Sequence, residues 1–348
     1  MRSRFCTLAL STNLETDPSP HPSPLGGERV SAGRVRGGSG VQCANRLRGI
    51  LSTVAALFCA SASLLGAQPS RPNILLIVSD DQGYSDLGCI GSKPILTPNL
   101  DRLAREGVRA TSFYVTWPAC TPSRGSILTG RYPQRNGLYD MVRNDMVNYR
   151  HQYTWEEYAV SPEMTLGLDP REITIGDVLQ RAGYATGMVG KWDMGQARRY
   201  LPLQRGFDFF YGHGNNGIDY YTHERYGVPS MFRGNQRTQE DRGAYATDLF
   251  KREALRFIRE NQDKPWFLYL CFNAPHGASS YEVRGVQAPE KYVALYPGKL
   301  MNERLTRYYA AVTCMDEAIG EIHALIKELG QDQNTLTVFH SDNGGSGN

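Results

Sequence analysis

The stretch CTPSRGSILTGR at residues 120–131 indicates both a local fold and a chemistry. Pro122 suits the first turn of a helix, because the N–H group that proline lacks would have no intrahelical partner there. Few helix breakers follow it, so we expect a helix that begins at or just before Cys120. Backbone N–H groups at such a terminus favour an anionic oxygen, and Arg124, one turn further on, can donate two hydrogen bonds to an oxyanion.

Four apolar runs of strand length occur elsewhere and alternate with helical patterns. The runs lie at residues 73–79, 185–189, 266–272 and 335–340, and the clearest helical patterns lie at 98–106, 175–182, 248–261 and 304–329. Strands that are continuously apolar are typical of a sheet covered on both faces. The sequence therefore predicts an α/β fold with a large, mostly parallel central sheet and helices on both faces.

Polar side chains follow these runs. Asp80 and Asp81 come after the first run, and Asp342 and Asn343 come after the last. Ligand sites in open α/β sheets lie at the carboxyl ends of the strands, and adjacent buried carboxylates are costly unless they bind a cation. Oxygen donors of this kind suit Ca²⁺ or Mg²⁺ rather than Zn²⁺. The alternative for each pair is a simple turn, since Asp and Asn are common turn residues.

Lys191 and His276 follow the two remaining runs. A lysine at this edge can hold an anionic oxygen as a point charge, and a histidine can protonate a leaving alkoxide or phenolate as a general acid. A single lysine or histidine on a loop is more often solvated and idle, so neither residue indicates a role by itself.

Taken in order along the chain, these motifs resemble those of the sulfatase family. Besides the cysteine motif, the matching segments are IVSDD at 77–81, TPNLD at 97–101, GKW at 190–192, APH at 274–276 and SDNG at 341–344. The resemblance covers residues 71–348 and implies the fold of the alkaline phosphatase superfamily, to which sulfatases belong.

The resemblance also implies an unusual nucleophile. In this family a maturation enzyme oxidises the motif cysteine to formylglycine, whose aldehyde hydrates to a diol. One hydroxyl then attacks the sulfur of a sulfate ester, and the other collapses to the aldehyde and expels sulfate. The implied catalytic residues are Cys120, Arg124, Lys191 and His276.

The same resemblance implies a cofactor and partners. Asp193 joins Lys191 and His276 as an implied substrate contact. The implied ligands of one Ca²⁺ ion are Asp80, Asp81, Cys120, Asp342 and Asn343. The implied partners are a sulfated small molecule or glycan as substrate, and the formylglycine-generating maturation enzyme.

The chain departs from the family pattern in two places. Family members usually have Gly-Lys-Trp-His, whereas this chain has Asp193 in place of the histidine that contacts the diol. Either another histidine takes that part, with His213 and His223 as candidates by composition, or the diol collapses differently. The chain also stops at Asn348. We therefore expect an incomplete catalytic domain at 71–348, truncated at its C-terminus, without a second catalytic lysine and a small C-terminal antiparallel-sheet domain.

The first 70 residues differ in composition from the rest. Residues 1–44 include a stretch rich in Pro, Ser, Gly and Arg, which predicts disorder or a misassigned upstream start. Residues 45–67 have a basic start, an apolar middle and a small-residue ending, the pattern of a signal peptide that is too short for a transmembrane helix. We expect export to the periplasm or the exterior, without stable membrane insertion. The net charge of +3 comes from this segment, so no nucleic-acid partner is expected.

Three functions remain open at this point. The first is a calcium-dependent sulfatase acting on a carbohydrate or aryl sulfate. The second is a phosphonate monoester or phosphodiester hydrolase with the same nucleophile, and the third is an inactive, truncated sulfatase-like protein. Two aromatic-rich segments without clear periodicity, at 139–170 and 208–242, suit either the binding of a sugar ring or packing against one another.

Overall fold

The computed structural model describes residues 5–9, 71–296 and 302–345. The described residues from Pro72 onward form one compact unit together with strand β1, Phe5–Ala9. The rest of the segment 1–44, for which disorder or a misassigned start is predicted, lies outside the described residues, so that interpretation stays a prediction. The predicted signal peptide at 45–67 lies outside the described residues, so it stays a prediction.

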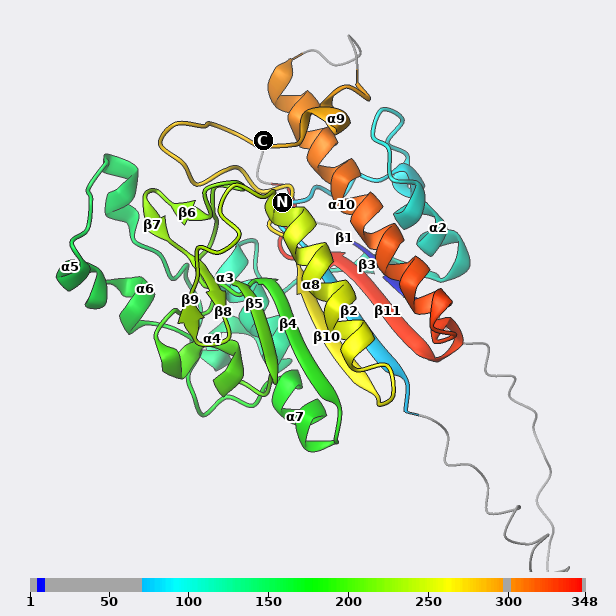
Figure 1. Ribbon diagram of the computed structural model, residues 1–348, viewed down its shortest axis with the longest axis horizontal. Coiled ribbons are helices and arrows are strands. Elements are labelled where there is room, and N and C mark those ends of the chain that lie inside the picture. Colours follow the sequence, from blue (N-terminus) through cyan, green and yellow to red (C-terminus); the bar gives the residue numbers. More distant parts are fainter. Residues whose placement is uncertain (1–4, 10–70, 297–301, 346–348) are drawn as a thin grey trace, which may run out of the picture. The chain divides into compact units, whose positions relative to one another are not determined.

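A nine-stranded sheet with the order β3-β1-β11-β2-β10-β4-β5-β8-β9 forms the centre of this unit (Figure 1). Its remaining strands are β2 (Asn73–Ser79), β3 (Val108–Phe113), β4 (Ala185–Lys191), β5 (Phe209–His213), β8 (Met231–Arg233), β9 (Gln236–Arg237), β10 (Trp266–Cys271) and β11 (Thr335–Ser341). The central strands from β11 to β5 run parallel, and antiparallel pairs lie toward the two edges. The predicted mostly parallel sheet is confirmed.

The helices expected from the sequence are also present. They are α2 (Pro98–Glu106), α3 (Cys120–Thr129), α7 (Ile175–Arg181), α8 (Ala246–Glu260) and α10 (Glu303–Glu328). Shorter helices are α4 (Pro133–Asn136), α5 (Trp155–Ala159), α6 (Pro162–Thr165) and α9 (Glu290–Val293). The helix predicted from the proline in the cysteine motif begins at Cys120 itself, with Ala119 in extended conformation before it.

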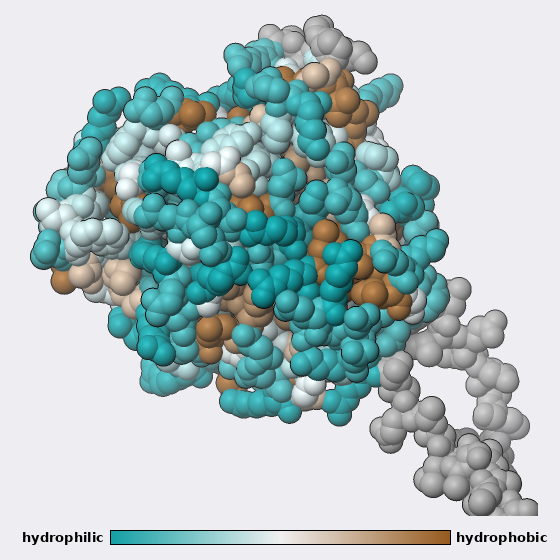
Figure 2. Space-filling model, in the orientation of Figure 1, coloured by the Kyte–Doolittle hydropathy of each residue, from teal (hydrophilic) through white to brown (hydrophobic). Residues whose placement is uncertain are grey.

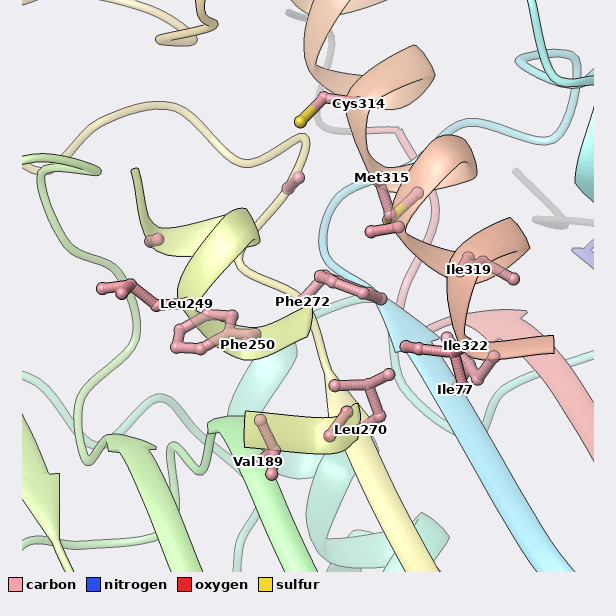
Figure 3. Close-up of a cluster of buried hydrophobic side chains, with 14 of the residues drawn as sticks. Ile77, Val189, Leu249, Phe250, Leu270, Phe272, Cys314, Met315, Ile319 and Ile322 are labelled. Carbon is pink, nitrogen blue, oxygen red and sulfur yellow. The ribbon is translucent and has the colours of Figure 1, made fainter. Parts of the chain in front are cut away.

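The helices cover both faces of the sheet. On one face, Phe250 of α8 and Ile319 of α10 pack with Val189, Leu270 and Phe272, which belong to β4, β10 and the residue after β10 (Figure 3). On the other face, α3 and α7 pack against a second apolar cluster that includes side chains of β2, β4 and β10. Burial on both faces explains why these strands read as continuous apolar runs.

The face of the molecule that carries α8 and α10 is mostly hydrophilic at its surface (Figure 2). Within the described part of the chain, no helix combines the length and the apolar character needed to cross a membrane.

The aromatic side chains of the two aromatic-rich segments differ in burial. They contain a 3₁₀ helix (Asp145–Tyr149), α5, α6, β5, β8, β9 and the small two-stranded sheet of β6 (Glu224–Arg225) and β7 (Val228–Pro229). Tyr158, Tyr211 and Tyr220 are buried, whereas Tyr149 and Trp155 are 80% and 62% exposed. Some of these rings therefore belong to the packed interior, and others face solvent.

Gly190 lets β4 pass close to β10 just before the polar edge of the sheet. Its φ is +102°, a conformation that favours glycine, and a Cβ at this position would lie 1.8 Å from the carbonyl oxygen of Cys271. Because that contact is with backbone, a side chain would push the two strands apart.

We predict that Gly190→Ala destabilises the protein far more than Gly330→Ala. Gly330 also has a positive φ, +67°, but a Cβ there would meet nothing within 4 Å. The left-handed backbone alone costs about 1–2 kcal/mol for a residue with a Cβ, and overpacking adds about 1–3 kcal/mol at Gly190. Urea unfolding measures both variants, and equal losses of unfolding free energy would contradict the close approach of β4 and β10.

Candidate active site

The polar residues that follow the four predicted strands meet at one edge of the sheet. In the sheet, β2 and β4 flank β10, and β11 pairs with the other side of β2, all in parallel. The carboxyl ends of parallel neighbours lie at the same edge. The residues brought there are Asp80 and Asp81 after β2, Lys191 and Asp193 at the end of β4, His276 after β10, and Asp342 and Asn343 after β11.

Cys120 reaches the same edge as the first residue of α3, and it is buried. Its thiol donates a hydrogen bond to Asp80 Oδ1 over 3.4 Å. Burial raises the pKa of this thiol well above its usual value, although the charge of Lys191 acts in the opposite direction. The thiol therefore stays protonated, and a protonated thiol is a poor nucleophile.

Arg124, one helical turn after Cys120, is fully buried among carboxylates. Its Nε and Nη2 donate to Asp342 Oδ2 over 3.1 and 2.9 Å, and its Nη2 lies 3.5 Å from Asp80 Oδ1. Its Nη1 donates to the carbonyl oxygen of Lys191 over 3.1 Å. Burial opposes the charge, but Asp342 and Asp80 together raise the pKa of Arg124, so the guanidinium is a fixed cation.

Lys191 supplies the second buried cation. Its Nζ lies 2.7 Å from Asp80 Oδ2 and 3.9 Å from Asp193 Oδ2. Burial again opposes the charge, and Asp80 outweighs it and raises the pKa of the lysine. The two cations face four buried aspartates, Asp80, Asp81, Asp193 and Asp342, so the cluster contains more carboxylates than positive side chains.

Several possible ligand atoms of the cluster lie close enough together to hold one cation. Ligand atoms of Asp80, Cys120 and Asp342 lie within 4.8 Å of one another. Asp81 joins them, because its N–H donates to Asp342 Oδ1 over 3.2 Å and its Oδ1 accepts from Asn343 Nδ2 over 2.7 Å. Asn343 Oδ1 is buried and has no hydrogen bond to any described residue. Burial, and to a smaller extent the charge of Asp342, raises the pKa of Asp80 although Lys191 lowers it, and a bound cation would offset both raising effects. The predicted ligands therefore fit a hard divalent ion.

Asp193 occupies the position where the sequence departs from the family pattern. Its backbone is left-handed, with φ at +58°. Thr121 Oγ1 donates to Asp193 Oδ1 over 3.0 Å, while Oδ2 is buried and has no hydrogen bond within the part of the chain that the structure describes. Burial raises the pKa of Asp193 to about 6, although Lys191 lowers it. The carboxylate is thus held beside Thr121, the chain neighbour of Cys120, with one free oxygen.

His276 lies on the Asp81 side of the cluster. Its Nε2 is 3.8 Å from Asp81 Oδ2, and its Nδ1 donates to the carbonyl oxygen of Gly277 over 2.6 Å. Burial, with a further effect from Lys191, lowers the pKa of His276 and favours the neutral ring.

The two other histidine candidates differ in location. His213 is the register partner of Lys191 on the adjacent strand β5. His223 instead bonds through Nε2 to the carbonyl oxygen of Ala244, and the charges that act on its ring are Asp219, Asp241 and Arg242. The structure therefore brings His213 near the site and ties His223 to a different environment.

Two residues that the sequence analysis did not single out also support the site. Ser123 donates from its hydroxyl to the carbonyl oxygen of Asp342. The hydroxyl of Tyr220 lies within hydrogen-bond distance of the carbonyl oxygens of Asn273 and His276, at 2.9 and 2.8 Å. The position of Ser123 inside the cysteine motif could have indicated its part in the site. Tyr220 lies in the aromatic-rich segment 208–242, where nothing distinguishes it from its aromatic neighbours.

A mostly parallel α/β sheet with this cluster at its carboxyl edge is the arrangement of the alkaline phosphatase-like superfamily. The sequence profile of the Sulfatase family matches residues 72–348. The chain therefore belongs to the sulfatase family.

Curated relatives agree with this assignment. N-acetylgalactosamine-6-sulfatase of Canis lupus familiaris is 35% identical over 305 residues, which are 83% of this chain and 53% of the relative. Arylsulfatase J of Mus musculus is 34% identical over 80% of this chain and 44% of the relative. The chain thus spans about half the length of the curated relatives it matches.

Solved structures give the same result. The crystal structure of Ps i-CgsB is 33% identical with a TM-score of 0.68, covering 79% of this chain and 59% of that one. PsFucS1 sulfatase from Pseudoalteromonas sp. is 28% identical with a TM-score of 0.60, covering 83% and 57%.

We predict that Arg124→Met lowers the free energy of unfolding by about 3–5 kcal/mol, because it leaves buried carboxylates without their counter-charge. Arg131→Met is the matched control, since Arg131 is 45% exposed in its ion pair with Glu172 and should cost at most about 1 kcal/mol. Urea unfolding in metal-free buffer measures both variants. A loss at Arg124 no larger than that at Arg131 would show that the buried charges are compensated otherwise.

Proposed function

We propose that this chain carries the catalytic centre of a sulfatase that hydrolyses sulfate esters of a carbohydrate or an aryl alcohol through residue 120. The observation that carries the proposal is the buried convergence of Cys120, Arg124 and Lys191 with the Asp80 and Asp342 carboxylates. Two cations and a helix N-terminus at one point suit a sulfate group, whose oxygens accept hydrogen bonds.

Residue 120 supplies the chemistry only after oxidation. As formylglycine it provides a hydrated aldehyde, one hydroxyl of which attacks sulfur while the other later collapses to release sulfate. The buried, protonated thiol described above makes an unmodified Cys120 an unsuitable nucleophile. The implied partner is therefore a formylglycine-generating maturation enzyme.

Arg124 and Lys191 orient the reacting groups. Arg124 is held by Asp342 and by the Lys191 carbonyl oxygen, and Lys191 by Asp80. Both cations are fixed before substrate arrives, so they stabilise negative charge on sulfate oxygens without reorganising.

His276 and Asp193 are assigned the two proton transfers. Among the described residues, the nearest charged partner of His276 Nε2 is Asp81, at 3.8 Å. When the ring is charged, Nε2 donates a proton to the leaving oxygen of the alcohol. A bound anionic ester raises the pKa of His276 against the lowering effect of burial. Asp193 Oδ2, which has no hydrogen bond, accepts the proton of the hydroxyl that collapses, so a carboxylate takes the place of the usual histidine.

The metal site is assigned to Asp80, Asp81, residue 120, Asp342 and Asn343. A Ca²⁺ ion bound there supplies positive charge that favours a deprotonated oxygen at residue 120. An oxygen from formylglycine suits Ca²⁺ better than a thiol sulfur does, because Ca²⁺ prefers hard ligands.

Domain 71–348 is the proposed catalytic region, and export through the segment at 45–67 is part of the same proposal.

The relatives support a sulfated carbohydrate or aryl substrate. Two of them are named N-acetylgalactosamine-6-sulfatase and arylsulfatase J. Ps i-CgsB, which is 32% identical to this chain, has been crystallised in complex with k-i-k-neocarrahexaose.

We predict that Cys120 is converted to formylglycine in a host that contains the maturation enzyme, and that Cys120→Ala abolishes turnover of 4-nitrophenyl sulfate. Peptide mass spectrometry of residues around 120 detects the aldehyde. The control is Cys271→Ala, because Cys271 is a buried free cysteine in β10 outside the motif; it should stay unmodified in the parent protein and its replacement should leave residue 120 converted. Active protein with only unmodified Cys120 would contradict the proposal, as would faster turnover of an aryl phosphonate ester than of the sulfate.

We predict that chelation abolishes activity and that Ca²⁺ restores it better than Zn²⁺. Because a ligand that binds only the folded state raises its stability, Ca²⁺ should also raise the thermal midpoint of the chelated protein. Asp342→Asn should lose this shift. Asp316→Asn should keep it, since Asp316 is also buried but instead accepts from the backbone N–H groups of Asn99 and Leu100. Full activity in metal-free protein would refute the metal site.

A further inference from the structure

The segment His213–Gly217 begins at the last residue of β5 and has a neighbour from the site at each end. His213 lies in register with Lys191, and its carbonyl oxygen accepts from the N–H of Trp192 over 2.9 Å. At the other end, a Cβ on Gly217 would lie 2.9 Å from His276 Cε1. The segment therefore runs from the lysine assigned to the sulfate to the histidine assigned to the leaving alcohol.

His213 offers one free acceptor in this segment. The side chain is fully buried, and its Nδ1 lies 2.9 Å from the carbonyl oxygen of Asn215. A carbonyl oxygen only accepts, so Nδ1 carries the hydrogen and Nε2 presents a lone pair. Burial, then the charges of Lys191 and Arg124, lowers the pKa of His213 well below its usual value and keeps the ring neutral. Nε2 has no hydrogen-bond partner among the described residues.

Asn215 offers a second free acceptor. Its Nδ2 donates to Ser230 Oγ over 2.7 Å, and Ser230 Oγ in turn donates to the carbonyl oxygen of Val228 over 2.8 Å. This chain of donors fixes the orientation of the amide, so the other atom is the carbonyl oxygen Oδ1. Oδ1 is also buried and, within the described part of the chain, without a partner.

These two buried acceptors, which have no partner among the described residues, suit a ligand that donates hydrogen bonds, because leaving them unpaired is costly. A sulfate group offers acceptors alone and is matched instead by Arg124 and Lys191. The alcohol part of a sugar ester carries hydroxyl donors, whereas a simple aryl alcohol leaves no hydroxyl once it is esterified. The free acceptors therefore favour a sugar.

We propose that His213 Nε2 and Asn215 Oδ1 form a subsite that accepts hydrogen bonds from hydroxyl groups on the alcohol part of the ester, which makes the substrate a sulfated sugar rather than a simple aryl sulfate. This inference rests on the proposed sulfatase function. The ring of His213 also packs against Phe250 of α8, with ring centroids 6.3 Å apart, and Figure 3 shows Phe250 within the apolar cluster. His213 is thus packed against the hydrophobic core.

The test compares two substrates on protein that carries formylglycine. A panel of monosulfated glucose, galactose and N-acetylgalactosamine identifies the best sugar substrate, and 4-nitrophenyl sulfate is the reference without hydroxyl groups. His213→Phe keeps a flat ring and removes the acceptor. We expect kcat/KM for the sugar to fall about 10–100-fold, with kcat/KM for 4-nitrophenyl sulfate changed less than about threefold.

His323→Phe is the matched control. His323 in α10 is a partly buried histidine whose Nε2 has no hydrogen-bond partner in the described structure. Burial, and then the charge of Arg102, lowers the pKa of its ring. It should change neither rate. Asn215→Leu provides an independent second variant of the subsite, with the same selective loss expected.

A deoxy sugar sulfate separates the subsite from other roles. If a hydroxyl of the sugar bonds to His213, the analogue lacking that hydroxyl should be turned over equally well by the parent protein and by His213→Phe. Equal losses on the sugar and the aryl sulfate would overturn the inference, because they would place His213 on the diol or in the packing. No turnover of any sulfate ester by the parent protein would instead refute the proposed function itself.

Discussion

The buried charge cluster of Arg124, Lys191, Asp80 and Asp342 is the constraint on which the rest of the site depends. Each ion is removed from water, which is tolerable only with close partners, and contacts of 2.7 and 2.9 Å provide them. The partners come from three strands and a helix. The cluster therefore forms only when β2, β4 and β11 are in register and α3 begins at the edge they share.

The same burial makes an unmodified cysteine at this position a poor nucleophile. A low-dielectric environment with several carboxylates keeps the Cys120 thiol protonated, so the position that favours a bound anion also suppresses thiolate chemistry. Lys191 Nζ lies 3.9 Å from Asp193 Oδ2, and Asp193 Oδ1 accepts a hydrogen bond from Thr121, the residue next to Cys120.

In the proposed function, two kinds of recognition act on the ester. The fixed cations would face the sulfate oxygens, and the segment from His213 to Gly217 would present acceptors to the alcohol. Hydrogen-bond polarity alone separates these halves, because sulfate cannot donate and a guanidinium or ammonium cannot accept. A site of this kind discriminates strongly against a substrate that lacks the matching hydroxyl, because a buried acceptor would then be left unpaired.

The sequence by itself determined the strands, the main helices and the polar residues that gather at one edge of the sheet. Apolar runs set by burial on both faces predicted β2, β4, β10 and β11, and the proline in the cysteine motif predicted the start of α3 within a residue. Local pattern reaches this far because propensity and periodicity act over a few neighbours. Only the tertiary structure decided that Thr121 holds Asp193, that His213 rather than His223 approaches Lys191, and which histidine nitrogen is free. Those outcomes depend on register and on hydrogen bonds between residues far apart in the chain, which no local pattern encodes.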